Sequence, residues 1–386
     1  MNHGKFQLLI AGIVASFKNN NNTMRKINIK IFTFYVLFLF AAASCVGTKI
    51  NKKEVIVTNV PVKTQNLDSI AFTNIPVLFD VQTEGEKWVD SVYNAMTLDE
   101  KIGQLFMVAA YSNKDAKHNA GIDKLIQENK IGGLIFFQGG PVRQAKLTNR
   151  YQALSKIPLF IGNDAEWGLG MRLDSTYRYP WNMTLGAIQD MKLIEKLGAQ
   201  MGTESKRLGL HFNFAPVLDI NSNPKNPIIG FRSFGEDKIE VAEHAIALMK
   251  GIQSQGVFAT GKHFPGHGDT SKDSHKELPT IFSTKEKLEE VEFYPYQKMF
   301  HDGLSSVMVG HLNVPSLETR PNYPSSISYN IVTNVLQKKL GFKGLIFTDA
   351  MNMKGVSDFK LPSELNFEAF MAGNDILLFP ENVPAT

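Results

Sequence analysis

Cysteine is nearly absent from this chain of 386 residues, which contains it once, at Cys45. A single thiol excludes an intramolecular disulfide framework and any zinc or iron–sulfur site that needs several cysteines. An excess of charge or of glycine is also lacking, because 20% of the residues are charged and 30 are Gly. Together with 27 Phe, this composition excludes disordered, collagen-like and coiled-coil proteins. The length fits two or three average domains, or one α/β barrel of about 250 residues with additional segments.

The formal net charge of +4 is concentrated at the N-terminus. Residues 1–53 contain 8 Lys and Arg and no Asp or Glu, which leaves 33 basic and 37 acidic residues in the remainder. The remainder therefore carries a net charge of −4. Because a globally basic surface is not supported, we expect no nucleic-acid partner.

The basic N-terminal segment has the layout of an export signal. Arg25, Lys26 and Lys30 precede an apolar run over residues 31–43, which small residues follow up to position 44. A charged region, a short apolar region and small residues at a cleavage site are typical of a secretory signal. The run is too short for a transmembrane helix, which needs about 20 apolar residues.

The position of Cys45 resembles that of the lipidated cysteine in bacterial lipoproteins, although Ala42 stands where Leu is usual. We therefore expect an upstream segment and lipoprotein signal peptide over residues 1–44, lipidation of Cys45, and a polar tether over residues 45–84. The protein would then be exported and held at a membrane by its lipid anchor, in the periplasm or at the outer membrane of a bacterium. Ordinary secretion with an incidental cysteine is the alternative.

From about residue 85, short apolar runs alternate with longer amphipathic stretches. Near-continuous apolar strands between helices indicate a parallel sheet covered on both faces. Eight such units predict a (β/α)8 barrel, with an open doubly wound sheet as the alternative. Helical patterns cover residues 190–208, 239–255 and 284–302. The eight apolar runs are residues 104–109, 133–137, 159–163, 212–217, 258–262, 306–310, 345–348 and 375–379.

The eighth run ends seven residues before the C-terminus, which leaves no room for a closing helix. We therefore expect a barrel domain over residues 85–386 that is truncated after its eighth strand. The natural chain would continue beyond Thr386 and have room for an additional C-terminal domain. No glycine-rich phosphate-binding motif follows a strand, so nucleotide binding has no support.

Charged and polar residues follow most of the predicted strands. In a (β/α)8 barrel the ends of the strands meet at one face, where active sites lie. A single strand-end Asp can instead cap the next helix, so the set as a whole carries the functional interpretation. The set consists of Asp164, Glu166, Arg172, Asp219, Arg232, Lys262, His263, His311 and Asp349.

The loop after the fifth run contains Asp273 and His275. In an extended backbone, side chains two residues apart point the same way, so the Asp273 carboxylate can orient the imidazole. Such a pair suits general acid/base work near neutral pH. A solvent-exposed polar loop without function is the alternative. Gly and Pro residues between His263 and His267 exclude a helix there, so these two do not form a helical zinc-binding pair.

The stretch from Lys262 to His275 reads Lys-His-Phe-Pro-Gly-His-Gly-Asp-Thr-Ser-Lys-Asp-Ser-His. It resembles, nearly residue for residue, the signature of the β-N-acetylglucosaminidases of glycoside hydrolase family 3. The resemblance runs from about Asp99 to Pro380 and so covers the whole predicted barrel. One departure is Trp167, because the family usually has two Gly after the Glu. This Trp could stack on a sugar, narrow the pocket or only pack.

The resemblance implies a role for each candidate residue. Asp349 would be the nucleophile, and His275, assisted by Asp273, the acid/base in place of the usual carboxylic acid. The positions that match the sugar-binding residues of the family are Asp164, Arg172, Arg232, Lys262 and His263. The implied reaction is a retaining double displacement that releases terminal β-linked GlcNAc from glycans such as peptidoglycan fragments. It needs no metal and no organic cofactor.

Three other functions stay open at this point. A β-glucosidase or β-xylosidase of the same family generally lacks the Asp-x-His loop. A metal-dependent barrel hydrolase would use His263, His267 and His311 with an Asp. A non-catalytic glycan-binding lipoprotein would have no need of a nucleophile such as Asp349.

Overall fold

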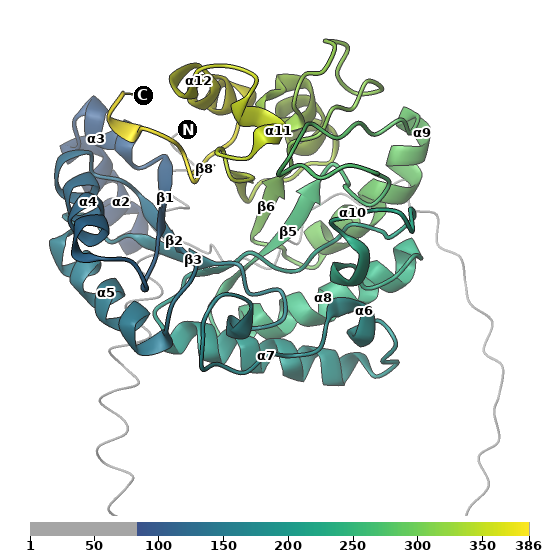
Figure 1. Ribbon diagram of the computed structural model, residues 1–386, viewed down its shortest axis with the longest axis horizontal. Helices are drawn as coiled ribbons and strands as arrows, with labels where there is room; N and C mark the ends of the chain where they lie inside the picture. The colour runs from purple at the N-terminus through teal and green to yellow at the C-terminus, as the bar shows by residue number, and fades with distance from the viewer. Residues whose placement is uncertain (1–82, 386) are drawn as a thin grey trace, which may run out of the picture. The chain divides into compact units, whose positions relative to one another are not determined.

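The computed structural model describes residues 83–385, which form eight parallel strands surrounded by helices (Figure 1). The strands pair in chain order, and β1 also pairs with β8. A bridge between Phe347 and Ile376 joins β7 to the segment before β8, so the ring is nearly closed. The predicted (β/α)8 barrel is confirmed, and the open doubly wound sheet is wrong. The strands are β1 (Phe106–Ala110), β2 (Gly133–Phe136), β3 (Phe160–Asn163), β4 (Phe212–Asn213), β5 (Phe258–Phe264), β6 (Ser306–Val309), β7 (Leu345–Thr348) and β8 (Leu377–Leu378).

Every residue of these strands is buried, as expected for strands covered on both faces. Inside the barrel, Phe212 lies between Phe160, at a ring-centroid distance of 5.0 Å, and Phe347, at 5.1 Å. Met107 and Met308 belong to the same cluster. Because side chains fill the interior, a ligand reaches the barrel only at its ends.

The predicted strand bounds agree with the observed ones to within two residues, except at the end of β4. The run at 212–217 yields only Phe212–Asn213 as β4, because the N–H of Ala215 donates locally to the carbonyl of Asn213 and not to a neighbouring strand. A bridge to β5 follows at Val217. In contrast, β5 extends to Phe264, two residues beyond the prediction. The pairing of β5 with β6 shifts register between Lys262 and Phe264.

Helices connect the strands and cover the outside of the barrel (Figure 1). The α-helices are α2 (Thr83–Ala95), α3 (Leu98–Gly103), α4 (Ala116–Glu128), α5 (Pro141–Leu154), α6 (Asn182–Leu185), α7 (Met191–Arg207), α8 (Lys238–Ser254), α9 (Lys285–Lys287), α10 (Phe293–His301), α11 (Lys354–Ser357) and α12 (Pro362–Ala372). Two π-helices, η3 (Leu288–Glu292) and η5 (Asn330–Lys339), and four short 3₁₀-helices, η1 (Leu169–Met171), η2 (Gly230–Arg232), η4 (Ser325–Ile327) and η6 (Val383–Ala385), complete the set.

The helices predicted at 190–208 and 239–255 are confirmed as α7 and α8. Asp190 and Asp237 cap them, because each side chain accepts a hydrogen bond from a free N–H of the first turn. The two helices pack so closely that a Cβ on Gly251 would lie 2.1 Å from the carbonyl oxygen of Glu195. The stretch predicted as one helix at 284–302 is helical but contains the π-turn η3 between α9 and α10.

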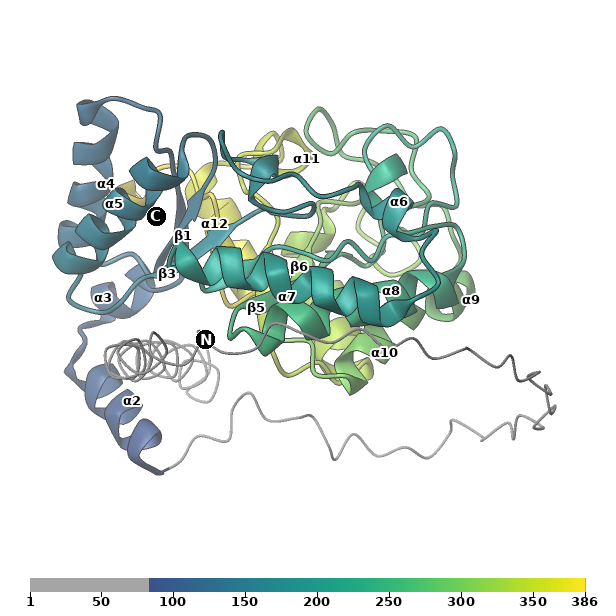
Figure 2. The same ribbon diagram turned by 90° about the horizontal axis from the view of Figure 1, so that it is seen from below.

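The loops that follow the strands, with the short helices α6 and α11, gather at one end of the barrel (Figure 2, top). This end therefore receives the charged residues predicted after the strands. The export signal, Cys45 and nearly all of the 45–84 tether lie outside the described residues. Among residues 83–385, no helix is long and apolar enough to cross a bilayer.

Candidate active site

A cavity of about 570 Å³ opens at the end of the barrel where the strands finish. Apolar side chains of the barrel, including Ile135, Met308 and Leu378, form part of its wall. The predicted site residues that line the cavity come from five different strands and loops: Asp164, Arg172, Arg232, Lys262, His263, His275 and Asp349. Of the predicted residues that the structure describes, Asp273, Asp219 and His311 are not among the lining residues; Asp273 contacts His275, and Asp219 contacts His263. The structure thus brings together side chains that are up to 185 positions apart in the sequence, from Asp164 to Asp349.

An ion-pair network of five side chains, called here the charged network, forms one side of the cavity. The Lys262 Nζ lies 2.8 Å from Asp164 Oδ1 and 2.8 Å from Glu166 Oε1. The Arg172 guanidinium donates to Asp164 Oδ2 at 2.6 Å. The Arg232 guanidinium donates to both oxygens of Glu166, at 2.9 and 2.7 Å. Three cations and two carboxylates therefore hold one another in fixed positions.

The cations keep both carboxylates ionised in spite of their burial. Burial alone would raise the pKa of Glu166, but the charges of Arg232 and Lys262 outweigh it and lower the pKa to about 2. The pKa of Asp164 is lowered far below its usual range in the same way, because Lys262 and Arg172 outweigh the effect of burial. Since burial of unpaired charges is very costly, this network is stable only as a complete set. It presents fixed donors and acceptors to a polar ligand.

A second pair of side chains orients His263. The Nδ1 of His263 lies 2.7 Å from Asp219 Oδ2, and the backbone N–H of His267 donates to Asp219 Oδ1 at 2.7 Å. Burial alone would raise the pKa of Asp219, but His263 and His267 outweigh it and lower the pKa. An ionised Asp219 accepts the Nδ1 proton, which leaves Nε2 of His263 facing Arg232 at 3.3 Å. The register shift in β5 lets Lys262 and His263, although consecutive, both line the cavity.

Asp349 directly follows β7 and is held by backbone groups of β6 and of the next residue. Its N–H donates to the carbonyl of Val309 at 2.8 Å, and its Oδ1 accepts from the N–H of Ala350 at 2.8 Å. Burial would raise the pKa of Asp349, but the imidazoles of His263 and His311 and the Ala350 N–H lower it. The carboxylate is therefore ionised at neutral pH, as a nucleophile must be.

The Asp273–His275 pair has the expected contact but a different backbone from the one predicted. The Nδ1 of His275 lies 3.0 Å from Asp273 Oδ1, and the same oxygen accepts the N–H of His275 at 2.8 Å. The segment is a turn and not extended, because the N–H groups of Lys276 and Glu277 donate back to the Asp273 carbonyl. The Asp273 side chain thus builds the turn and orients the ring at once. The His275 side chain is 62% exposed, so it stands at the mouth of the cavity.

The part of the chain that matches a known protein family is the barrel described above. Residues 97–385 match the Glycosyl hydrolase family 3 N terminal domain. The chain belongs to glycosyl hydrolase family 3.

Two curated relatives of this chain are named as beta-hexosaminidases. The chain is 34% identical over 282 residues to beta-hexosaminidase A of Pseudoalteromonas piscicida. This alignment covers 67% of this chain and 47% of that relative. It is also 34% identical over 258 residues to a beta-hexosaminidase of Nitrosomonas eutropha. This second alignment covers 64% of this chain and 73% of that relative. The chain spans about half the length of the first curated relatives it matches.

A solved structure shows the same likeness in three dimensions. It is a glycoside hydrolase family 3 beta-N-acetylglucosaminidase from Paenibacillus sp. str. FPU-7, with a TM-score of 0.69 and 37% sequence identity. The match covers 74% of this chain and 55% of that one. The family and the barrel expected from the sequence are therefore confirmed.

The three histidines of the metal-dependent alternative are already engaged in this family 3 barrel. His263 contacts Asp219, and His267 contacts Thr270 and Ser274 through its two ring nitrogens. His311 uses Nδ1 for Ser326 and Nε2 for the carbonyl of Ala350. Within residues 83–385, no three or more His, Cys, Asp or Glu side chains converge on a common point where a metal ion fits.

Sequence reasoning singled out Glu166 and Asp219 as strand-end residues but assigned them no role. Glu166 stands two positions after Asp164 at the end of β3. From this spacing the sequence could have predicted that the two side chains point the same way. The contact of Asp219 with His263 had no such signal, because 44 residues separate them.

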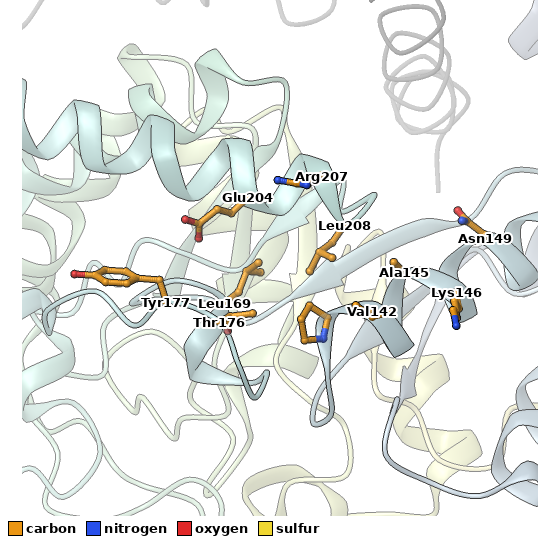
Figure 3. Close-up of a pocket in the computed structure, with 11 residues that line it drawn as sticks. Val142, Ala145, Lys146, Asn149, Leu169, Thr176, Tyr177, Glu204, Arg207 and Leu208 are labelled. Atoms are coloured by element: carbon orange, nitrogen blue, oxygen red, sulfur yellow. The ribbon is translucent and has the colours of Figure 1, made fainter. Parts of the chain in front are cut away.

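A second hollow of about 450 Å³ lies on the outside of the barrel, between α5 and α7 (Figure 3). Val142, Ala145 and Leu208 supply apolar surface, and Glu204 is the only carboxylate among its lining residues. That carboxylate already accepts a hydrogen bond from Tyr179 at 2.7 Å. Glycoside hydrolysis requires two catalytic groups, and the outer hollow has no second carboxylate or imidazole among its lining residues.

Proposed function

We propose that this family 3 barrel is a retaining exo-β-N-acetylglucosaminidase, with Asp349 as nucleophile and His275 as acid/base. The observation that carries the proposal is that an ionised Asp349 and an Asp273-bound His275 line one cavity beside the charged network. A nucleophile and a proton donor on one pocket are the minimum for double displacement. The beta-hexosaminidase names of the relatives support the same activity.

The reaction would proceed in two steps. Protonated His275 gives its proton to the glycosidic oxygen while a carboxylate oxygen of Asp349 attacks the anomeric carbon, so the leaving alcohol departs and a covalent glycosyl–enzyme forms. Neutral His275 then takes a proton from water, which displaces Asp349 and releases the sugar in its original β configuration. An imidazole acid avoids placing a second carboxylate beside Asp349, where like charges would repel.

The charged network would bind the sugar hydroxyl and acetamido groups. Asp164 accepts hydrogen bonds, while Arg172, Arg232 and Lys262 donate them, and His263 presents Nε2 to the same space. Since the carboxylates fix the cations in advance, little reorganisation is required when the sugar enters. Terminal β-linked GlcNAc in peptidoglycan fragments is the natural substrate that we propose, with lipidation of Cys45 holding the enzyme at the membrane.

The stereochemical course tests the proposed mechanism. Proton NMR taken during the first minutes of nitrophenyl β-GlcNAc hydrolysis should show the β anomer of GlcNAc before mutarotation. Appearance of the α anomer first would refute a covalent intermediate on Asp349. A panel of nitrophenyl glycosides tests the substrate, because faster turnover of the glucoside or xyloside would favour the β-glucosidase or β-xylosidase alternative.

The membrane anchor is tested separately. A chain expressed in bacteria with radiolabelled palmitate should incorporate label, and Cys45→Ser should not. Equal labelling of both would contradict lipidation of Cys45.

A further inference from the structure

An aromatic group lies at one edge of the cavity, and the proposed mechanism does not use it. It consists of Trp167, Trp181 and Phe231, here called the aromatic rim. The ring centroids of Trp167 and Trp181 are 4.2 Å apart, and those of Trp181 and Phe231 are 4.0 Å apart. Trp167 and Phe231 line the cavity, and Trp181 stands behind them.

Contacts from neighbouring side chains fix the position of the aromatic rim. The guanidinium of Arg178 lies 4.3 Å from the Trp181 ring centroid and 5.5 Å from that of Trp167. The side chain of Asn182, the residue after Trp181, donates to the carbonyl of Arg232 at 2.7 Å. This bond ties α6 to η2, which carries Phe231. A rigid aromatic face loses little conformational entropy when a ligand stacks on it.

Exposure places Phe231 at the mouth of the cavity. Phe231 is 53% exposed although it belongs to a packed aromatic cluster, and the side chain of His275 is 62% exposed. Lys262 and Glu166, in contrast, are almost completely buried, so the sugar that they bind sits deeper. The acid must contact the oxygen of the leaving group, and that oxygen therefore lies at the level of the mouth. A leaving group held at that level has the exposed ring of Phe231 in the wall of the same cavity.

We propose that Phe231, supported by Trp181, is a binding platform for the leaving group and that it takes a pyranose ring. This inference rests on the proposed function and adds to it the side chains that hold the leaving group. The C–H face of a pyranose is apolar and fits flat on an aromatic ring, whereas a small alcohol offers no such face. Trp167, which stands where the family usually has Gly, widens the platform toward the charged network.

The test compares a leaving group that has a second ring with one that has none. For Phe231→Ala, the ratio of kcat/KM on chitobiose to kcat/KM on methyl β-GlcNAc should fall about five- to tenfold, as expected from loss of one stacking contact. Phe231→Tyr should restore the ratio, because it keeps the aromatic face. Phe367→Ala removes a ring that is 62% exposed on α12 and should leave the ratio unchanged. An unchanged ratio in Phe231→Ala would overturn the platform.

Binding separates failure of the platform from failure of the proposed function. In the Asp349→Ala background, calorimetry should show that Phe231→Ala weakens the binding of chitobiose about five- to tenfold and that of GlcNAc by a smaller factor. If the wild type hydrolyses neither substrate, the proposed function fails, and this measurement still decides on the platform. Equal weakening of both ligands, or binding of neither, would overturn the platform.

Discussion

Two parts of the same cavity differ in how far their titratable side chains are exposed to solvent. The charged network buries Asp164, Glu166 and Lys262 and keeps them ionised by mutual contacts. The Asp273–His275 pair stands in a turn at the mouth, with the imidazole largely in solvent. Groups that bind a sugar need fixed charge and position, whereas an acid/base must change its protonation state twice in each turnover. The difference in burial therefore matches a difference in task.

Removing Asp349, which lines the same cavity as the two parts, should have the largest effect. Asp349→Ala should lower kcat on an aryl β-GlcNAc by on the order of 10⁴-fold, the size found when one member of a catalytic set is removed. A discontinuous or continuous assay of nitrophenol release measures this loss of kcat. Far-UV circular dichroism should match the wild type, because Asp349 is paired mainly with backbone groups. Near-normal turnover by Asp349→Ala would contradict the assignment of Asp349 as the nucleophile.

His275→Ala should separate the exposed part from the buried part. We expect a loss of about 10²–10⁴-fold on chitobiose, whose leaving group needs a proton, and a much smaller loss on dinitrophenyl β-GlcNAc. Steady-state kcat/KM on the two substrates gives the answer. Equal losses on both would mean that His275 binds substrate as the charged network does, and the contrast between the two parts would fail.

Lys262→Met should show the cost of breaking the buried part. It leaves Asp164 and Glu166 without a shared cation, so we expect about 3–5 kcal/mol less stability in urea denaturation. Lys124→Met is the matched control, because it breaks an exposed pair with Glu128 at 3.7 Å and should cost less than about 1 kcal/mol. Similar losses in the two variants would contradict the importance of burial.

Glu292 sharpens the comparison, because it is almost as buried as Glu166. Within residues 83–385, Glu292 forms no ion pair like those of Glu166, and the attraction of Lys287 only partly offsets its burial. Burial, together with the charges of Asp219 and Asp269, raises its pKa to about 8. It is therefore protonated in the folded protein at pH 7 and ionised in the unfolded chain, so its contribution to stability is lost as pH rises from about 4.5 to about 8.

Glu292→Gln should therefore flatten the pH dependence of stability between pH 5 and 8, an effect of about 3–4 kcal/mol. Urea midpoints measured across this range provide the test. Glu166 has the opposite sign, since its lowered pKa means that its contribution is lost as pH falls from about 4.5 to about 2. If Glu292→Gln kept the slope of the wild type, another group would be responsible for it.

Much of the fold was predictable, because it depends on local patterns. Apolar runs of strand length alternate with helical stretches, and this alternation predicts a barrel without any knowledge of contacts. The errors lie where local hydrogen bonds interrupt a pattern, as at Ala215, whose N–H donates to the carbonyl of Asn213 at the end of β4. The turn at Asp273 was another error, because a side-chain hydrogen bond to the backbone decided the conformation.

The sequence by itself determined which chemical groups stand at the strand ends and which family the chain resembles, because strand ends and signature loops are local in the chain. Only the tertiary structure decided which of them share a charge network and which remain in solvent. The pairing of Asp219 with His263, the opposite pKa shifts of Glu166 and Glu292, and the exposure of Phe231 all depend on neighbours distant in sequence. Desolvation and Coulomb interactions act through space, so residue order alone does not reveal them.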